Sequence, residues 1–276
     1  MPFFETHDQT SLYYRDWGTG TPIVFLGGIA FSGAMWEYQM VPLSNQGLRC
    51  IALDRRGHGR SDDPGRGYDF DSLADDVAQL LAHLDLHEVT LVGYSMGGGE
   101  VARYLSRHGT SRIARAVLIS SITPFLLQTE DNPEGAPRIV IEQNITAMQK
   151  DRPHYLTSGA IKFSGLGSFW PWPDVQSPEM VQWGIQVCLE CSPKAAAECT
   201  RTQGETDFRP DMPAFTVPTL IVHGDKDQST PLELCGRRTA QAIAGSQFNV
   251  YEGGWHNLFF THKDRLNDDL FTFIQG

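Results

Sequence analysis

The stretch Leu91-Val92-Gly93-Tyr94-Ser95-Met96-Gly97-Gly98-Gly99 decides the fold of this chain. The largely apolar residues 88–92 are typical of a buried strand, and residues 100–105 are typical of a helix. A strand that runs directly into a helix through G-x-S-x-G predicts a sharp turn, with its serine in a strained backbone conformation. A bare G-x-S-x-G also occurs by chance in roughly one chain of this length in ten. Here the context favours the turn. Each glycine at the start of the helix costs about 1 kcal/mol relative to alanine, so a requirement other than helix propensity must select these glycines.

Length and composition limit the kind of protein this is. The 276 residues fit one large domain or one domain with an insertion. A net charge of −11 argues against nucleic acid or an anionic membrane as a partner. The chain shows no signal peptide and no apolar run long enough to span a membrane. Five cysteines without framework spacing are consistent with a reducing compartment, so we expect a cytoplasmic protein.

Strand and helix patterns alternate along most of the chain. Apolar strands are expected at residues 21–26, 49–54, 114–120, 217–222 and 247–251. Between Thr123 and Pro213 the alternation stops, and helix-like pieces are separated by Pro/Gly clusters. The pattern predicts a doubly wound, mostly parallel α/β sheet, with a core of residues 1–123 and 213–276 and a helical cap insertion at 124–212.

The loops after later strands supply the partners that a nucleophilic serine needs. A serine is a poor nucleophile unless a base takes its proton and a third group orients that base. Asp225 and Asp227 follow one predicted strand, and His256 follows the next. Chain order does not choose between the two aspartates. Two backbone N–H groups are expected to hold the oxyanion, one from Met96 and one from Ile29 in the loop after residues 21–26.

The chain resembles one known group of enzymes in six stretches, at residues 16–20, 35–40, 54–62, 93–104, 205–212 and 223–228. This is the cofactor-free bacterial haloperoxidase and aryl esterase group of the α/β-hydrolase superfamily. The resemblance implies the α/β-hydrolase fold, no metal or organic cofactor, and esterase activity on small carboxylic and aryl esters. It also implies a promiscuous perhydrolase activity, in which hydrogen peroxide replaces water and the released peracid oxidises halide. Within His-Gly-Asp-x-Asp-Gln-x-x-Pro, matched from His223 to Pro231, the family's acid is the second Asp, which is Asp227.

Two positions depart from the family pattern. The family has His-Gly and a bulky aromatic after its first parallel strand, where this chain has Gly27-Gly28-Ile29. The smaller side chain of Ile29 implies a roomier acyl side. The family has Gly after the catalytic histidine, where this chain has Asn257.

Two other groups of residues have competing interpretations. Cys188, Cys191 and Cys199 include a CxxC and could suggest a metal site, but without a second pair we expect small buried residues on one helical face and no metal. An aromatic cluster in the insertion could line a substrate pocket or pack the insertion onto the sheet; it comprises Phe163, Phe169, Trp170, Trp172 and Trp183. The expected pocket residues are Trp170, Trp172 and Phe125.

The sequence therefore predicts a serine hydrolase that cleaves small carboxylic or aryl esters through an acyl-enzyme intermediate. Ser95, Asp227 and His256 are the expected catalytic residues. The alternatives are a cofactor-free haloperoxidase or perhydrolase, a lactonase or amidase with the same triad, and a non-catalytic receptor of this fold for a small hydrophobic ligand. The expected partner is a small-molecule ester, and a homo-oligomer is left open.

Overall fold

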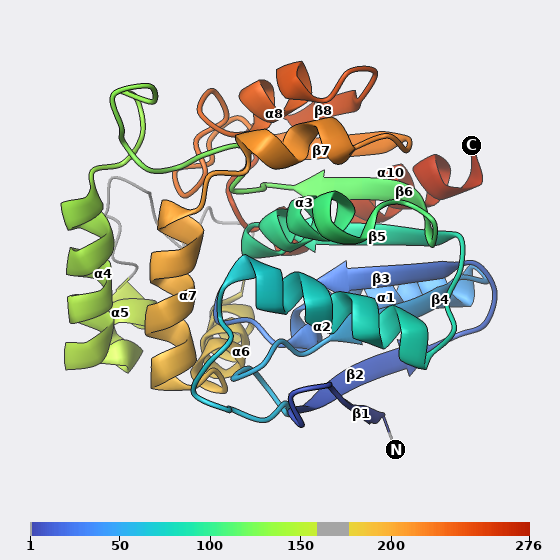
Figure 1. The fold of residues 1–276 in the computed structure, drawn as a ribbon, viewed down its shortest axis with the longest axis horizontal. Helices are drawn as coiled ribbons and strands as arrows, with labels where there is room; N and C mark the ends of the chain where they lie inside the picture. Colours follow the sequence, from blue (N-terminus) through green and yellow to red (C-terminus); the bar gives the residue numbers. More distant parts are fainter. Residues whose placement is uncertain (1, 159–176) are drawn as a thin grey trace.

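Eight strands form one sheet through the centre of the molecule, in the order β1-β2-β4-β3-β5-β6-β7-β8 (Figure 1). The structure is a computed structural model that describes residues 2–158 and 177–276. The pairs β1–β2 and β2–β4 are antiparallel, and every other neighbouring pair is parallel. The predicted mostly parallel α/β sheet is thus confirmed. The strands are β1 (Phe3–Glu5), β2 (Ser11–Trp17), β3 (Pro22–Leu26), β4 (Arg49–Leu53), β5 (Val89–Tyr94), β6 (Ile113–Ile119), β7 (Thr219–Gly224) and β8 (Gln247–Tyr251).

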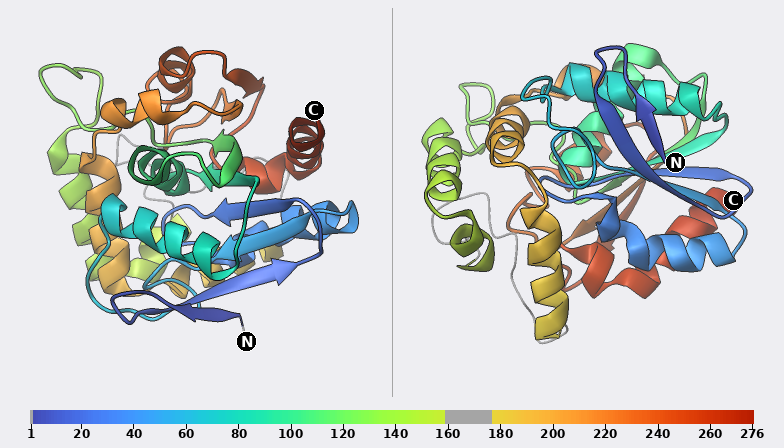
Figure 2. Two further views of the ribbon diagram at one scale, coloured as in Figure 1. Left: turned by 45° about the vertical axis from the view of Figure 1, so that its right-hand side comes forward. Right: turned by 90° about the horizontal axis from the view of Figure 1, so that it is seen from below.

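Helices cover both faces of the sheet. The helices α2 (Phe70–His83) and α3 (Met96–His108) pack together on one face, and α1 (Glu37–Asn45) and α10 (Lys263–Gln275) lie on the other (Figure 2). Every residue of β5 is buried as a result. This double cover explains why the central strands are continuous apolar runs rather than alternating ones.

Four helices lie beyond the carboxyl ends of the parallel strands (Figure 1). They are α4 (Arg138–Lys150), α5 (Arg152–Ser158), α6 (Pro178–Leu189) and α7 (Pro193–Glu205). All four come between β6 and β7 in the chain, so they fall inside the predicted insertion. The division into a core of residues 1–123 and 213–276 and a cap of 124–212 remains a prediction. The shorter elements are η1 (Gly33–Trp36), η2 (Arg209–Ala214), α8 (Gly236–Ala242) and α9 (Leu258–Thr261).

The turn between β5 and α3 holds Ser95 in a strained conformation, with φ 52° and ψ −114°. Residues other than glycine rarely adopt a positive φ. A Cβ on Gly93 would overlap the carbonyl of Gly97, and a Cβ on Gly97 would overlap the carbonyl of Leu26. The two glycines are therefore required by close backbone approach.

The three cysteines of the insertion are all buried but do not share one helix, which corrects that prediction. Cys188 lies in α6, Cys191 in the connection and Cys199 in α7. The reason is a helix boundary between them, since Ser192 caps α7 by accepting a bond from the Ala195 N–H, and Pro193 takes the first helical position. The described ranges hold no group of three or more His, Cys, Asp or Glu arranged to bind a metal ion.

Within residues 2–158 and 177–276, every helix is too short or too polar to cross a lipid bilayer.

Candidate active site

Three loops at the carboxyl edge of the sheet bring Ser95, His256 and Asp227 together. The Ser95 hydroxyl lies 3.0 Å from His256 Nε2, and His256 Nδ1 lies 2.8 Å from Asp227 Oδ2. All three residues are buried, at 4%, 2% and 5% exposure. The contacts form a continuous hydrogen-bonded chain from hydroxyl to imidazole to carboxylate, which is the geometry that lets a histidine accept the proton of a serine.

The carboxylate of Asp227 is held by several donors besides His256. Its Oδ1 accepts bonds from the backbone N–H groups of Ser229 and Thr230, each 2.9 Å away. The Thr230 hydroxyl lies 2.9 Å from Oδ2 and 3.1 Å from the carbonyl oxygen of Ser120. Burial opposes ionisation of Asp227, but its interactions with His256 outweigh that effect and lower the pKa of the carboxyl.

The side chain of Asp225 contacts a different loop and has a structural role. Its Oδ1 accepts a 2.8 Å bond from the Gly253 N–H, which ties the loop after β7 to the loop after β8. The structure therefore brings Asp227, and not Asp225, into contact with His256. The sequence analysis did not identify Thr230 as a partner of Asp227. Its position three residues after Asp227, within reach of the carboxylate, could have indicated this contact.

Ser95 and His256 open into a small cavity of about 50 Å³, measured between the described residues. Ile29 lines this cavity, as expected of a residue beside the oxyanion. The pocket prediction for Phe125 is corrected, because its side chain packs with Leu127 and Ile141, while its neighbour Leu126 lines the cavity. Trp170 and Trp172 lie outside the described residues.

The two expected oxyanion donors belong to two different elements of the fold. Met96 is the first residue of α3, where a backbone N–H has no partner within the helix. Ile29 belongs to the loop after β3. The Arg55 guanidinium fixes this loop by donating to the carbonyls of Gly27 at 2.7 Å and Gly28 at 3.3 Å. Arg55 also pairs with the buried Glu100, its Nε lying 2.6 Å from Oε1. The family pattern favoured a structural loop at Arg55-Arg56 over an anion-binding pair, but the partners of Arg55 were not apparent from the sequence, because they are far away along the chain.

Replacing Arg55 by methionine is expected to lower the free energy of unfolding by about 3–5 kcal/mol, because it leaves the Glu100 carboxylate buried without its counter-charge. Chemical denaturation measures this change. Arg15→Met is the matched control, because the Arg15–Glu37 pair is partly exposed and is expected to contribute no more than about 1 kcal/mol. Equal losses in the two variants would contradict the expectation.

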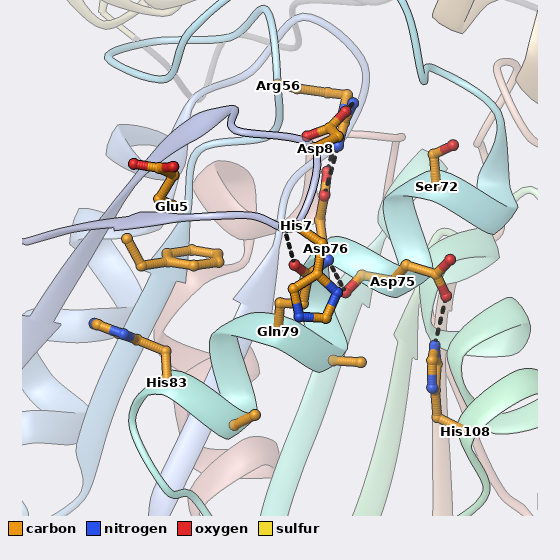
Figure 3. Close-up of a pocket in the computed structure, with 13 residues that line it drawn as sticks. Glu5, His7, Asp8, Arg56, Ser72, Asp75, Asp76, Gln79, His83 and His108 are labelled. Atoms are coloured by element: carbon orange, nitrogen blue, oxygen red, sulfur yellow. Dashed lines mark hydrogen bonds and ion pairs between the residues drawn. The ribbon is translucent and has the colours of Figure 1, made fainter.

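A second cavity, of about 610 Å³, lies between β1 and α2 (Figure 3) and shares no described lining residue with the cavity at Ser95. Its polar side chains largely pair with protein groups. Arg56 bonds to Asp76 and Asp8, and His108 bonds to Asp75 (Figure 3). These ion pairs join the first hairpin to α2 and α2 to α3, so we assign the groove to the stability of the fold.

Known proteins resemble this chain over its whole length. A family model described as the alpha/beta hydrolase fold matches residues 21–263. The non-heme haloperoxidase of Rhodococcus erythropolis is 41% identical over 277 residues, with 100% of both chains covered. The bifunctional esterase/perhydrolase of Acinetobacter calcoaceticus is 34% identical over 279 residues, again covering 100% of both. The solved esterase of Exiguobacterium antarcticum is 32% identical, with a TM-score of 0.91 and 99% of each chain covered.

Proposed function

Because this chain belongs to the alpha/beta hydrolase fold family, as its motifs predicted, we propose that it is a serine hydrolase of small carboxylic or aryl esters. The single observation that carries this proposal is the continuous hydrogen-bonded chain of Ser95, His256 and Asp227 beside a cavity. The esterase names among its relatives point to the same chemistry.

In the proposed mechanism His256 takes the proton of Ser95 as the serine oxygen attacks the ester carbonyl carbon. The backbone N–H groups of Ile29 and Met96 stabilise the negative charge on the carbonyl oxygen, and Asp227 stabilises the imidazolium. His256 then protonates the departing alkoxide, which leaves an acyl group on Ser95. A water molecule gives its proton to His256 and attacks the acyl-enzyme, and the returning proton restores the Ser95 hydroxyl.

A second activity is favoured by the names of the relatives. Several are called non-heme haloperoxidases or chloroperoxidases, and one is called an esterase/perhydrolase. The same acyl-enzyme supports perhydrolysis when hydrogen peroxide replaces water as the second nucleophile and a peracid leaves. The site would then need no additional catalytic group, since only the second nucleophile differs.

The test measures hydrolysis of phenyl acetate with and without hydrogen peroxide and bromide, together with labelling of Ser95 by a fluorophosphonate. We expect multiple turnover, labelling at Ser95, and bromide oxidation only when ester and peroxide are both present. Labelling without turnover would overturn the enzymatic proposal and favour a receptor. Turnover of esters without bromide oxidation would remove the second activity alone.

Replacing Ile29 by tryptophan is expected to reduce kcat/KM for bulky acyl esters more than for acetates. The cavity beside Ser95 holds only about 50 Å³, so an indole ring overfills it, and overpacking costs about 1–3 kcal/mol, or roughly 5- to 150-fold. Steady-state kinetics on a series of acyl lengths measures the difference. Ile29→Leu keeps the side-chain volume and serves as the control. An equal loss for both ester classes would show that this side chain does not face the acyl group.

A further inference from the structure

One wall of the cavity at Ser95 consists of polar side chains from three helices beyond the sheet. We call Asn144 of α4, Tyr155 of α5, and Thr200 and Gln203 of α7 the polar wall. Asn144, Tyr155 and Thr200 are only 6%, 8% and 7% exposed. Thus the reactive hydroxyl of Ser95 shares its cavity with buried amide and hydroxyl groups and not only with apolar side chains.

One atom of the polar wall is buried without a hydrogen-bond partner in the described part of the chain. It is Oε1 of Gln203. The Thr200 hydroxyl donates to the Ala196 carbonyl at 2.7 Å, which leaves its oxygen able to accept. Buried polar groups are normally hydrogen-bonded. A molecule bound in the cavity would supply the partner that the protein does not.

The cavity also limits the charge and size of that molecule. None of the residues that line it is Asp, Glu, Lys or Arg in the described ranges. Burial raises the pKa of Tyr155 to about 12, so its hydroxyl is uncharged at neutral pH. Among these described residues a carboxylate or an ammonium group would find no counter-charge, which is unfavourable. A volume of about 50 Å³ between the described residues is small for a ligand site, which favours a short substrate.

We infer that the ester cleaved at Ser95 is short and neutral and carries a hydroxyl or N–H donor within a few atoms of its carbonyl. The donor bonds to Oε1 of Gln203, while Asn144 and Tyr155 pair with the same polar group. This inference rests on the proposed function and names the substrate class of that site. Substrate discrimination would follow, because an ester lacking the donor leaves the buried Oε1 of Gln203 unpaired.

Two pairs of esters that differ only by a hydroxyl and a methyl group test the inference. Methyl 3-hydroxybutyrate against methyl 3-methylbutyrate places the difference on the acyl side. 2-Hydroxypropyl acetate against 2-methylpropyl acetate places it on the alcohol side. In at least one pair we expect kcat/KM for the hydroxyl ester to exceed that for its methyl counterpart by about tenfold or more. A ratio below about three in both pairs overturns the inference, and this result needs no variant to fold.

Variants then locate the preference in the polar wall. Gln203→Met and Asn144→Leu are each expected to reduce the hydroxyl-to-methyl ratio by about fivefold or more, through a loss of kcat/KM for the hydroxyl ester. Gln143→Met is the matched control, because Gln143 is an exposed neighbour of Asn144 on α4. Equal losses for both esters in the folded variants would overturn the assignment to the polar wall.

Phenyl acetate separates the failure of this inference from the failure of the proposed function. If phenyl acetate is hydrolysed and neither pair shows a preference, only the inference fails. If neither phenyl acetate nor any of the four esters is hydrolysed, the proposed function and the inference both fail.

Discussion

Replacing Ser95 by alanine is expected to lower kcat for a small aryl ester by roughly 10³-fold or more, because the nucleophile and its base act as a unit. The structure explains why the fold should survive this change. The Ser95 side chain bonds to His256, and alanine keeps the Cβ that the serine already accommodates at φ 52°. Steady-state kinetics measures the loss, and thermal unfolding verifies that the variant is folded.

The matched control is Ser111→Ala, on an exposed loop before β6, which should leave kcat unchanged. A Ser95→Ala enzyme that retained more than about a tenth of the wild-type turnover would exclude Ser95 as the nucleophile.

Replacing Asp227 by asparagine is expected to cost about 10⁴ in kcat while leaving the protein folded. Both carboxylate oxygens of Asp227 accept hydrogen bonds. Oδ1 accepts from the backbone N–H groups of Ser229 and Thr230, and Oδ2 accepts from the His256 imidazole. The NH₂ group of asparagine therefore has to face a donor. If it faces His256, the imidazole takes the tautomer that cannot accept the Ser95 proton.

Asp225→Asn is the comparison variant and is expected to stay active with a lowered melting temperature. An amide oxygen can still accept from Gly253 N–H, so the loss is one of stability, typically about 0.5–3 kcal/mol. Kinetics and thermal unfolding of both purified variants decide the assignment. An inactive Asp225→Asn beside an active Asp227→Asn would reverse it.

Local patterns were sufficient to predict the framework of the site. The apolar run of β5, the glycines around Ser95 and the start of α3 are adjacent in the chain, so their steric requirements appear together in the sequence. Periodicity likewise predicted the parallel strands, because strands covered on both faces are continuous apolar runs. For Asp225 and Asp227, which follow the same strand, the sequence order was insufficient, and the choice came from the family resemblance.

The parts that escaped prediction depend on contacts between distant segments. Arg55 braces residues 27 and 28 earlier in the chain and pairs with Glu100 later in it, and no local pattern encodes such a contact. The polar wall combines residues from α4, α5 and α7, whose mutual arrangement decides which side chains meet Ser95. Phe125 and Leu126 are neighbours in an irregular segment, where no periodicity indicates which of the two faces the cavity.

The backbone strain at Ser95 has a consequence for directed evolution of this chain. A positive φ suits glycine better than any residue with a Cβ, and strained residues cost on the order of 1–3 kcal/mol. Selection for heat resistance alone would therefore reward replacement of Ser95 by glycine, which removes the strained Cβ together with the nucleophilic hydroxyl. Variant libraries screened for melting temperature need a simultaneous activity screen, because thermal stability and catalytic activity favour different residues at position 95.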